Sequence, residues 1–162
     1  MKPMRIYVDT SVFGGFFDEG FSSASRRFFE MVRHRRVKVM VSDLLLDEIA
    51  EAPEPVRELV RSIMEHGCIR VGATEEAARL QDWYLAAGVV SPRYADDAMH
   101  VALATLQGAD AIVSWNFKHL VNPTRVRGFN QVNIQRGYGT TVILSPEELL
   151  HVLESEDAKD GR

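Results

Sequence analysis

The sequence reads Arg5-Ile-Tyr-Val-Asp-Thr-Ser-Val-Phe13 near its beginning, and this segment is the most informative about the fold class. Three apolar residues, from Ile6 to Val8, run straight into Asp9. A continuous apolar run that ends in polar residues is typical of a strand buried on both faces, as in a parallel sheet. In open α/β sheets, ligands bind just beyond the carboxyl ends of the strands. The stretch therefore predicts an α/β fold with Asp9 at the functional edge of the sheet.

The rest of the chain alternates between helical patterns and short apolar runs. Three polar residues are predicted N-caps: Ser42, Thr74 and Ser145, the last forming a capping box with Glu148. Further strands are predicted at 37–41, 68–71, 109–114 and 141–144. Helices are predicted at 22–35, 43–52, 54–65, 74–87, 91–107 and from 145 onward.

The composition is that of an ordinary globular protein, with 162 residues, 46% of them apolar and 26% charged. We assign residues 1–150 to a single domain and residues 151–162 to a charged, frayed C-terminal tail. No apolar run approaches the ~20 residues of a membrane span, and the first strand begins too early to leave room for a signal peptide. We therefore expect a cytoplasmic protein that does not contact membranes.

The charge and the cysteine content exclude some classes of site. The net charge of −4 argues against a uniformly basic nucleic-acid binder, although local basic patches remain open. Cys68 is the single cysteine, which excludes an internal disulfide and a cysteine-based metal cluster.

Glu48 lies on an apolar face of its predicted helix, together with Leu44 and Leu45. A carboxylate on a core-facing side is costly to bury unless a cation or hydrogen bonds compensate it. The alternative is that Glu48 lies at the margin of the apolar face, in water. The pattern alone does not choose between the two.

Asp97 lies near the start of another helix and shares a face with His100 and Val101. Its neighbour Asp96 points about 100° away. Asp97 is therefore predicted to face inward. For His100 we favour a hydrogen-bonded packing role over a role as proton donor or RNA contact.

Asn116 follows the strand predicted at 109–114, at the same edge of the sheet as Asp9. Its neutral oxygen can orient a metal-bound water or ligate weakly.

Like carboxylates brought together repel one another, and a shared divalent cation relieves that repulsion. All-oxygen ligands favour Mg²⁺ or Mn²⁺ over zinc. We predict Asp9 and Asp97 as direct metal ligands, with Glu48 binding directly or through water, around one tightly held ion.

The segment 122–138 is polar and basic, and it also carries Phe129 and Tyr138. Cations interleaved with aromatic rings suit single-stranded nucleic acid, because bases stack on rings while cations meet phosphates. A solvated connecting helix is the alternative interpretation.

Four motifs in order resemble those of the PIN-domain family, the ribonuclease fold of VapC-type toxins in bacterial and archaeal toxin–antitoxin pairs. They are Tyr-Val-Asp9-Thr-Ser, the segment 42–48, the run that begins at Asp97, and Ser-Trp-Asn116-Phe-Lys-His. The resemblance spans about residues 4–150. It implies a three-layer α/β/α sandwich around a mostly parallel sheet, and cleavage of RNA that depends on Mg²⁺ or Mn²⁺.

The resemblance also carries roles over to single residues. Asp9, Glu48 and Asp97 match the acidic triad of the family. Asn116 departs from the pattern, because many PIN nucleases have an acidic residue there, and this puts a second metal in doubt. The Trp-Asn-Phe-Lys-His form of this motif resembles that of a separate subgroup of bacterial PIN proteins.

We therefore expect a metal-dependent endoribonuclease, the toxin of a type II toxin–antitoxin pair, with Asp9, Glu48, Asp97 and Asn116 as catalytic residues. Its expected partners are RNA, a cognate antitoxin and a second copy of the chain. The alternative is a PIN-like protein that binds RNA or a partner without cutting, which Asn116 motivates. A phosphotransfer domain is disfavoured, because Ser11 replaces the second Asp of the dehalogenase motif and no Asp follows the strand at 68–71.

Overall fold

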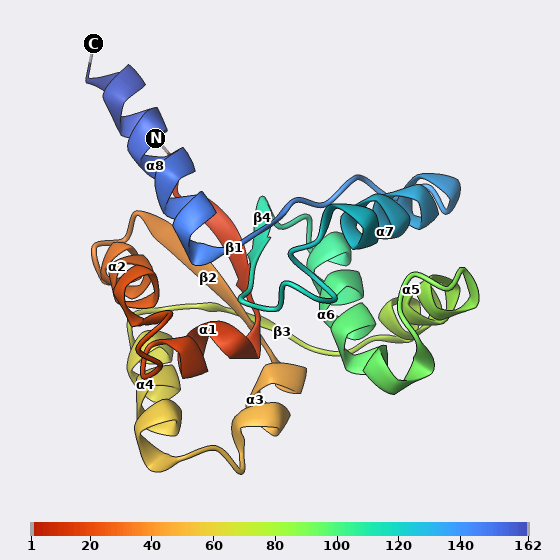
Figure 1. The fold of residues 1–162 in the computed structure, drawn as a ribbon, viewed down its shortest axis with the longest axis horizontal. Helices are drawn as coiled ribbons and strands as arrows, with labels where there is room; N and C mark the ends of the chain where they lie inside the picture. Colours follow the sequence, from red (N-terminus) through yellow and green to blue (C-terminus); the bar gives the residue numbers. More distant parts are fainter. Residues whose placement is uncertain (1, 162) are drawn as a thin grey trace.

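The computed structural model describes residues 2–161 and contains one five-stranded sheet in the order β3-β2-β1-β4-β5 (Figure 1). Every neighbouring pair of strands is parallel, as the buried apolar runs predict. The strands are β1 (Met4–Val8), β2 (Val37–Ser42), β3 (Ile69–Val71), β4 (Ala111–Val113) and β5 (Ile143–Leu144).

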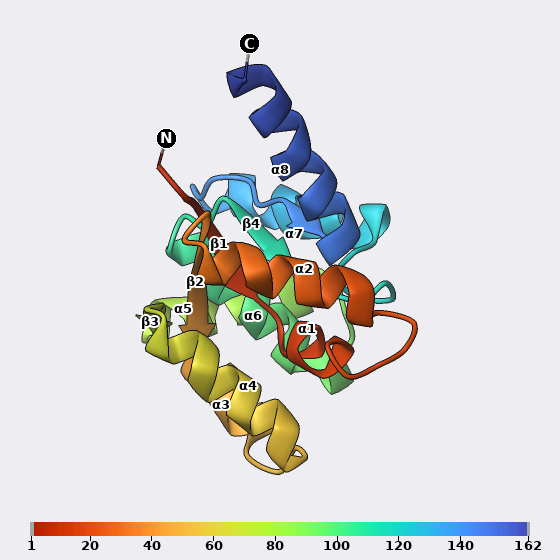
Figure 2. The same ribbon diagram turned by 90° about the vertical axis from the view of Figure 1, so that its left-hand side faces the viewer.

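Helices connect the strands and cover both faces of the sheet (Figure 2). The first four are α1 (Thr10–Gly15), α2 (Ser22–Arg33), α3 (Asp43–Ile49) and α4 (Glu54–Glu65). The remainder are α5 (Glu75–Ala86), α6 (Ala95–Leu106), α7 (Pro123–Gln135) and α8 (Pro146–Asp160), with a short 3₁₀ turn, Pro92–Tyr94, before α6. Among residues 2–161, none of the helices combines the length and apolar character that a membrane span requires.

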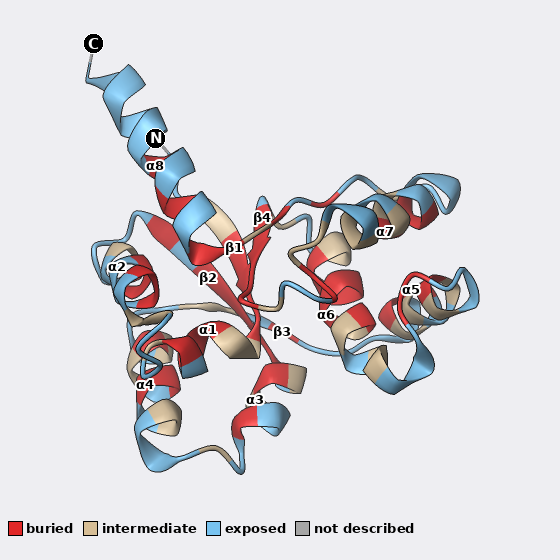
Figure 3. Ribbon diagram, in the orientation of Figure 1, coloured by how far each residue is buried: buried red, intermediate tan, exposed pale blue. Residues whose placement is uncertain are grey.

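Alternate residues of β1 build two separate cores. Ile6 and Val8 pack with residues of α1, α2, α4 and α8 on one face. Tyr7 points the other way and packs with residues of α5, α6 and α7. Figure 3 shows the buried residues concentrated along the strands and the inward sides of these helices. The fold is therefore the three-layer α/β/α sandwich that the resemblance implies.

The order of the strands places Asp9 at the point where the chain changes direction across the sheet. The chain runs outward from β1 to β2 and β3, then crosses to β4 and β5 on the other side of β1. Asp9 follows β1 directly, and its backbone N–H donates to the carbonyl of Val113 in β4 at 3.0 Å. Ligand sites of open α/β sheets lie at this kind of reversal.

The predicted caps are present. The Ser42 hydroxyl accepts from the backbone of Leu45 at 3.0 Å and begins α3. Thr74 caps α5 in the same way. Ser145 and Glu148 form the predicted capping box at the start of α8. These local signals were readable because each lies within three residues of its partner.

Two segments differ from their predicted character. Residues 151–160, predicted as a frayed tail, continue α8, where Leu153 is buried and ion pairs join Glu154 to Arg27 and Asp157 to Arg36 of the α2 end. Most of the segment 122–138 is helix α7, as the connecting-helix interpretation has it. Phe129 is fully buried there, so its ring is not available to stack on a base.

Candidate active site

Asp9 is 5% exposed and is held by two hydroxyl groups. Its Oδ2 accepts hydrogen bonds of 2.7 Å from Ser11 and from Ser114, which follows β4. Two neighbouring strand ends therefore supply one carboxylate and one of its donors. With Oδ2 engaged in this way, Oδ1 faces Nε2 of His100 at 3.7 Å.

Glu48 reaches the same place from α3, with a side chain that is 31% exposed. Its Oε1 lies 2.5 Å from Nε2 of His100 and accepts a hydrogen bond of 3.2 Å from the Thr10 hydroxyl. Glu48 therefore lies at the margin of the apolar face, partly exposed, and its carboxylate is also compensated by hydrogen bonds. Asp9 and Glu48 converge on a single ring nitrogen.

His100 is fully buried in α6, and both of its ring nitrogens have partners. The Tyr7 hydroxyl donates to Ser42 Oγ at 2.9 Å, so its oxygen accepts from Nδ1 of His100 at 2.6 Å. Burial lowers the pKa of His100, but the hydrogen bond to Glu48 and the charges of the surrounding carboxylates outweigh it and raise the pKa. His100 is hydrogen-bonded and packed as predicted, and it also contacts two predicted site residues.

Asp97 lies near the start of α6, one turn before His100, and its side chain is 21% exposed. Burial raises the pKa of its carboxyl group, and the negative charges of Asp9 and Glu48 add to this effect. His119 opposes the shift, because its Nδ1 lies 3.1 Å from Oδ2 of Asp97. The mutual repulsion places all three predicted carboxylates in one electrostatic environment. Asp96 is exposed, in line with its predicted outward direction.

Asn116 shapes the loop that follows β4. Its side-chain oxygen accepts from the backbone N–H groups of Lys118 at 3.2 Å and His119 at 3.0 Å. Its own backbone N–H donates to the Ser114 hydroxyl at 2.9 Å. Asn116 therefore links Ser114, which holds Asp9, to His119, which contacts Asp97. The predicted use of Asn116 to position water or substrate stays a prediction.

The carboxylates, as they lie, do not form a metal-binding group. Within residues 2–161, no three His, Cys, Asp or Glu side chains are arranged so that they could hold a metal ion. The ring of His100 lies against Asp9 and Glu48, and the ring of His119 lies against Asp97. Imidazole groups thus occupy part of the space between the predicted ligands.

Several contacts of this site were not predicted from the sequence. Ser114, His119 and the Tyr7 hydroxyl all touch a predicted site residue or its partner. Ser114 could have been identified, because it ends a strand at the same edge as Asp9. His119 and Tyr7 carried no periodic signal, and only the tertiary fold brings them to the carboxylates.

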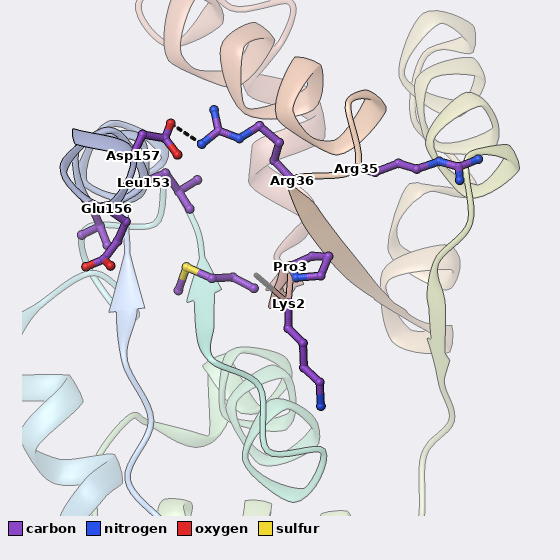
Figure 4. A pocket seen from close by; sticks show the side chains of 9 residues that line it. Lys2, Pro3, Arg35, Arg36, Leu153, Glu156 and Asp157 are labelled. Atoms are coloured by element: carbon purple, nitrogen blue, oxygen red, sulfur yellow. Dashed lines mark ion pairs between the residues drawn. The ribbon is translucent and has the colours of Figure 1, made fainter. Parts of the chain in front are cut away.

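Two cavities are relevant to the location of ligands. One, of about 420 Å³, adjoins the site and is lined by Tyr94, Lys118, His119 and Arg125 among others. Another, of about 430 Å³, is lined by Lys2 and Pro3, which precede β1, and by Leu153, Glu156 and Asp157 of α8 (Figure 4). This second cavity is at the amino end of β1, opposite Asp9, and contains none of the predicted site residues.

One protein-family model matches most of the chain. Residues 5–118 match the family model described as "PIN domain". This range begins in β1 and includes all four predicted catalytic residues. No curated protein sequence matches the chain.

Solved structures give matches of the fold. One is a chain of the crystal structure of VapBC2 from Rickettsia felis bound to a DNA fragment from their promoter. The TM-score is 0.55 and the sequence identity is 9%, with 88% of this chain and 98% of that chain covered. At this identity the likeness concerns the fold, and it extends over nearly the whole of the similar chain.

Proposed function

The chain belongs to the PIN-domain family, and from this premise we propose that it is an endoribonuclease that depends on a divalent metal ion. The observation that carries the proposal is the convergence of Asp9 and Glu48 on one nitrogen of His100, 3.7 and 2.5 Å away. Asp97, whose pKa responds to both carboxylates, completes the acidic group. Three acidic side chains gathered at the switch point of a parallel sheet favour metal-assisted phosphodiester chemistry over simple packing.

Asp9, Glu48 and Asp97 would hold the metal, and the donor chemistry fits. All three supply oxygen, the ligand atom that Mg²⁺ and Mn²⁺ prefer. Burial raises the pKa of Asp97 most, and the repulsion from Asp9 and Glu48 that adds to it is what a divalent cation relieves. Glu48 and Asp97 are the partly exposed members, so an ion could reach them from solvent. When bound, the ion supplies charge neutralisation at the phosphodiester and an acidified water.

The residues around the carboxylates contribute orientation. Ser11 and Ser114 fix Asp9 through its Oδ2. His100, itself fixed by Tyr7, directs Glu48 toward Asp9. Positioning of this kind is worth orders of magnitude in rate, because reacting groups must be held close to the productive geometry.

The direct test is cleavage of a mixed RNA pool by the purified chain in Mg²⁺, Mn²⁺ or EDTA. An Asp97→Asn variant and an Asp96→Asn variant, purified identically, serve as the inactive form and its matched control. We expect metal-dependent cleavage by the wild type and by Asp96→Asn, and none by Asp97→Asn. Cleavage by all three proteins in EDTA would contradict the proposal.

We further propose that this nuclease is the toxin of a type II toxin–antitoxin pair and acts in the cytoplasm. The likeness of its fold to a chain of the VapBC2 complex supports a protein partner, a cognate antitoxin. Controlled expression of the wild-type chain should slow bacterial growth, whereas expression of Asp97→Asn should not. If the expressed chain cleaves RNA but growth is unchanged, the toxin role is wrong and the proposed nuclease activity stands.

A further inference from the structure

The cavity beside the carboxylates carries two cations. Lys118 is exposed and Arg125 half-buried, and both line the cavity. Arg125 donates from Nη1 to the Val89 carbonyl at 2.6 Å, which fixes its position and uses one of the five N–H donors of the guanidinium group. Within residues 2–161, neither cation forms an ion pair with a carboxylate. In a chain of net charge −4, two unneutralised cations at one cavity favour an anionic ligand.

Two of the residues that line the cavity, Tyr94 and His119, have rings that lie against each other. The ring centroids of Tyr94 and His119 lie 3.8 Å apart. The ammonium group of Lys118 lies 5.8 Å from the Tyr94 ring centroid. Val90 and Pro92 add apolar surface to the lining. Rings and apolar groups beside cations are the combination that binds single-stranded nucleic acid, because bases stack while cations meet phosphates.

His119 connects the cavity to the acidic site. It lines the cavity with its ring, and its Nδ1 lies 3.1 Å from Oδ2 of Asp97. The volume of about 420 Å³ is within the range of roughly 300–1,000 Å³ that small-ligand sites occupy. A group bound in the cavity would therefore lie one side chain away from the carboxylates.

From these contacts we propose that the cavity is a subsite for one nucleotide of a single-stranded RNA, next to the phosphodiester that is cut. The base lies against Tyr94 and the apolar lining, and its phosphate meets Lys118 and Arg125. The inference rests on the proposed ribonuclease function and adds to it the residues that hold the nucleotide beside the cleaved bond, Tyr94, Lys118 and Arg125. A base inside a duplex is stacked on both faces and could not enter.

The test measures binding without cleavage. Fluorescein-labelled ten-residue oligouridylate and oligoadenylate are titrated with the full chain, in EDTA and again in Ca²⁺, and followed by fluorescence anisotropy. Lys118→Ala and Tyr94→Leu are the test variants, and Lys38→Ala is the control. Lys38 is also an exposed lysine, but it lies on β2 near the opposite end of the sheet.

We expect Lys118→Ala to bind about 5–10-fold more weakly than the wild type and Tyr94→Leu about tenfold more weakly. The dependence of log K on log salt should also become less steep by about 0.7 in Lys118→Ala, as for one lost phosphate contact. Lys38→Ala should bind as the wild type does. Lys118 is exposed, so Lys118→Ala should fold, and it keeps the test valid even if Tyr94→Leu does not fold.

Three outcomes would overturn the subsite. They are no binding of either oligonucleotide by the wild type in both buffers, unchanged binding by Lys118→Ala, and equal losses in Lys118→Ala and Lys38→Ala. Because no cleavage is needed, failure of the nuclease and failure of the subsite give different results. A chain that cuts RNA and tolerates Lys118→Ala without loss of affinity retains its function and loses only the subsite.

Discussion

Nε2 of His100 lies between two acidic side chains, 2.5 Å from Oε1 of Glu48 and 3.7 Å from Oδ1 of Asp9. These three residues come from α6, α3 and the end of β1, so the contact joins both helical layers to the sheet. The other ring nitrogen is held by Tyr7, which makes His100 a fixed point of the site.

Replacing His100 by Ala should lower the free energy of unfolding by about 2–4 kcal/mol. The change removes a fully buried ring and leaves the Tyr7 hydroxyl and Glu48 without their partner. Urea denaturation measures the loss. His151→Ala, an exposed histidine of α8, should change stability by no more than about 0.5 kcal/mol. Equal effects of the two substitutions would show that the contacts of His100 contribute nothing specific.

The stabilisation by His100 should depend on pH. The folded-state pKa of His100 is raised above its ordinary value of 6.5, so the folded chain binds this proton more tightly than the unfolded chain does. The contribution is fully present below about pH 6.5 and is lost as pH rises through the folded-state pKa. The stability difference between wild type and His100→Ala, measured in EDTA from pH 5.5 to 9, should therefore shrink toward high pH. A constant or growing difference would contradict the raised pKa of His100 in the folded chain.

Ser114→Ala should reduce activity at least tenfold and stability by about 1–3 kcal/mol. The hydroxyl donates to Asp9 and accepts from the backbone of Asn116, so its loss leaves Asp9 less constrained and an N–H unsatisfied. Ser155→Ala, on the exposed part of α8, is the matched control. Full RNA cleavage by Ser114→Ala would mean that the orientation of Asp9 does not limit the reaction.

Substitutions of Asn116 should separate its structural role from its chemical one. Asn116→Asp keeps the side-chain oxygen that accepts from Lys118 and His119, and we expect stability and cleavage at least equal to the wild type. Asn116→Ala removes that acceptor and should cost about 1 kcal/mol, with a loss of cleavage as the loop relaxes. Thermal melts and RNA cleavage measure both. An Ala variant as stable and as active as the wild type would remove Asn116 from the site.

The sequence predicted the parallel sheet and the place of Asp9 at the end of β1 well, because the signals for them are local. The apolar run before Asp9 and the capping box at Ser145 each span only a few residues. The environment of Glu48 could not be predicted in the same way. Its helix face left burial and exposure equally open, and the partner that decides, His100, lies on another helix.

The remaining differences also depend on long-range contacts. Residues 151–160 look like a charged tail in the sequence, but Glu154 pairs with Arg27 in α2 and Asp157 with Arg36, which follows that helix. Phe129 looks like part of a basic and aromatic RNA-binding segment, yet its ring packs edge-to-face against Tyr84 of α5. In each case the deciding partner lies far away in the sequence, so the composition of the segment alone does not reveal it.

The claim on which the account depends is that Asp9, Glu48 and Asp97 bind a shared divalent ion. Titration of the chain with Mn²⁺, followed by the loss of the electron paramagnetic resonance signal of the free ion, tests it without RNA. We predict that the wild type and Asp96→Asn bind one Mn²⁺ with the same affinity, and that Asp9→Asn and Asp97→Asn bind it at least tenfold more weakly. A wild type that binds no Mn²⁺, or an Asp97→Asn variant that binds it unchanged, would contradict the account.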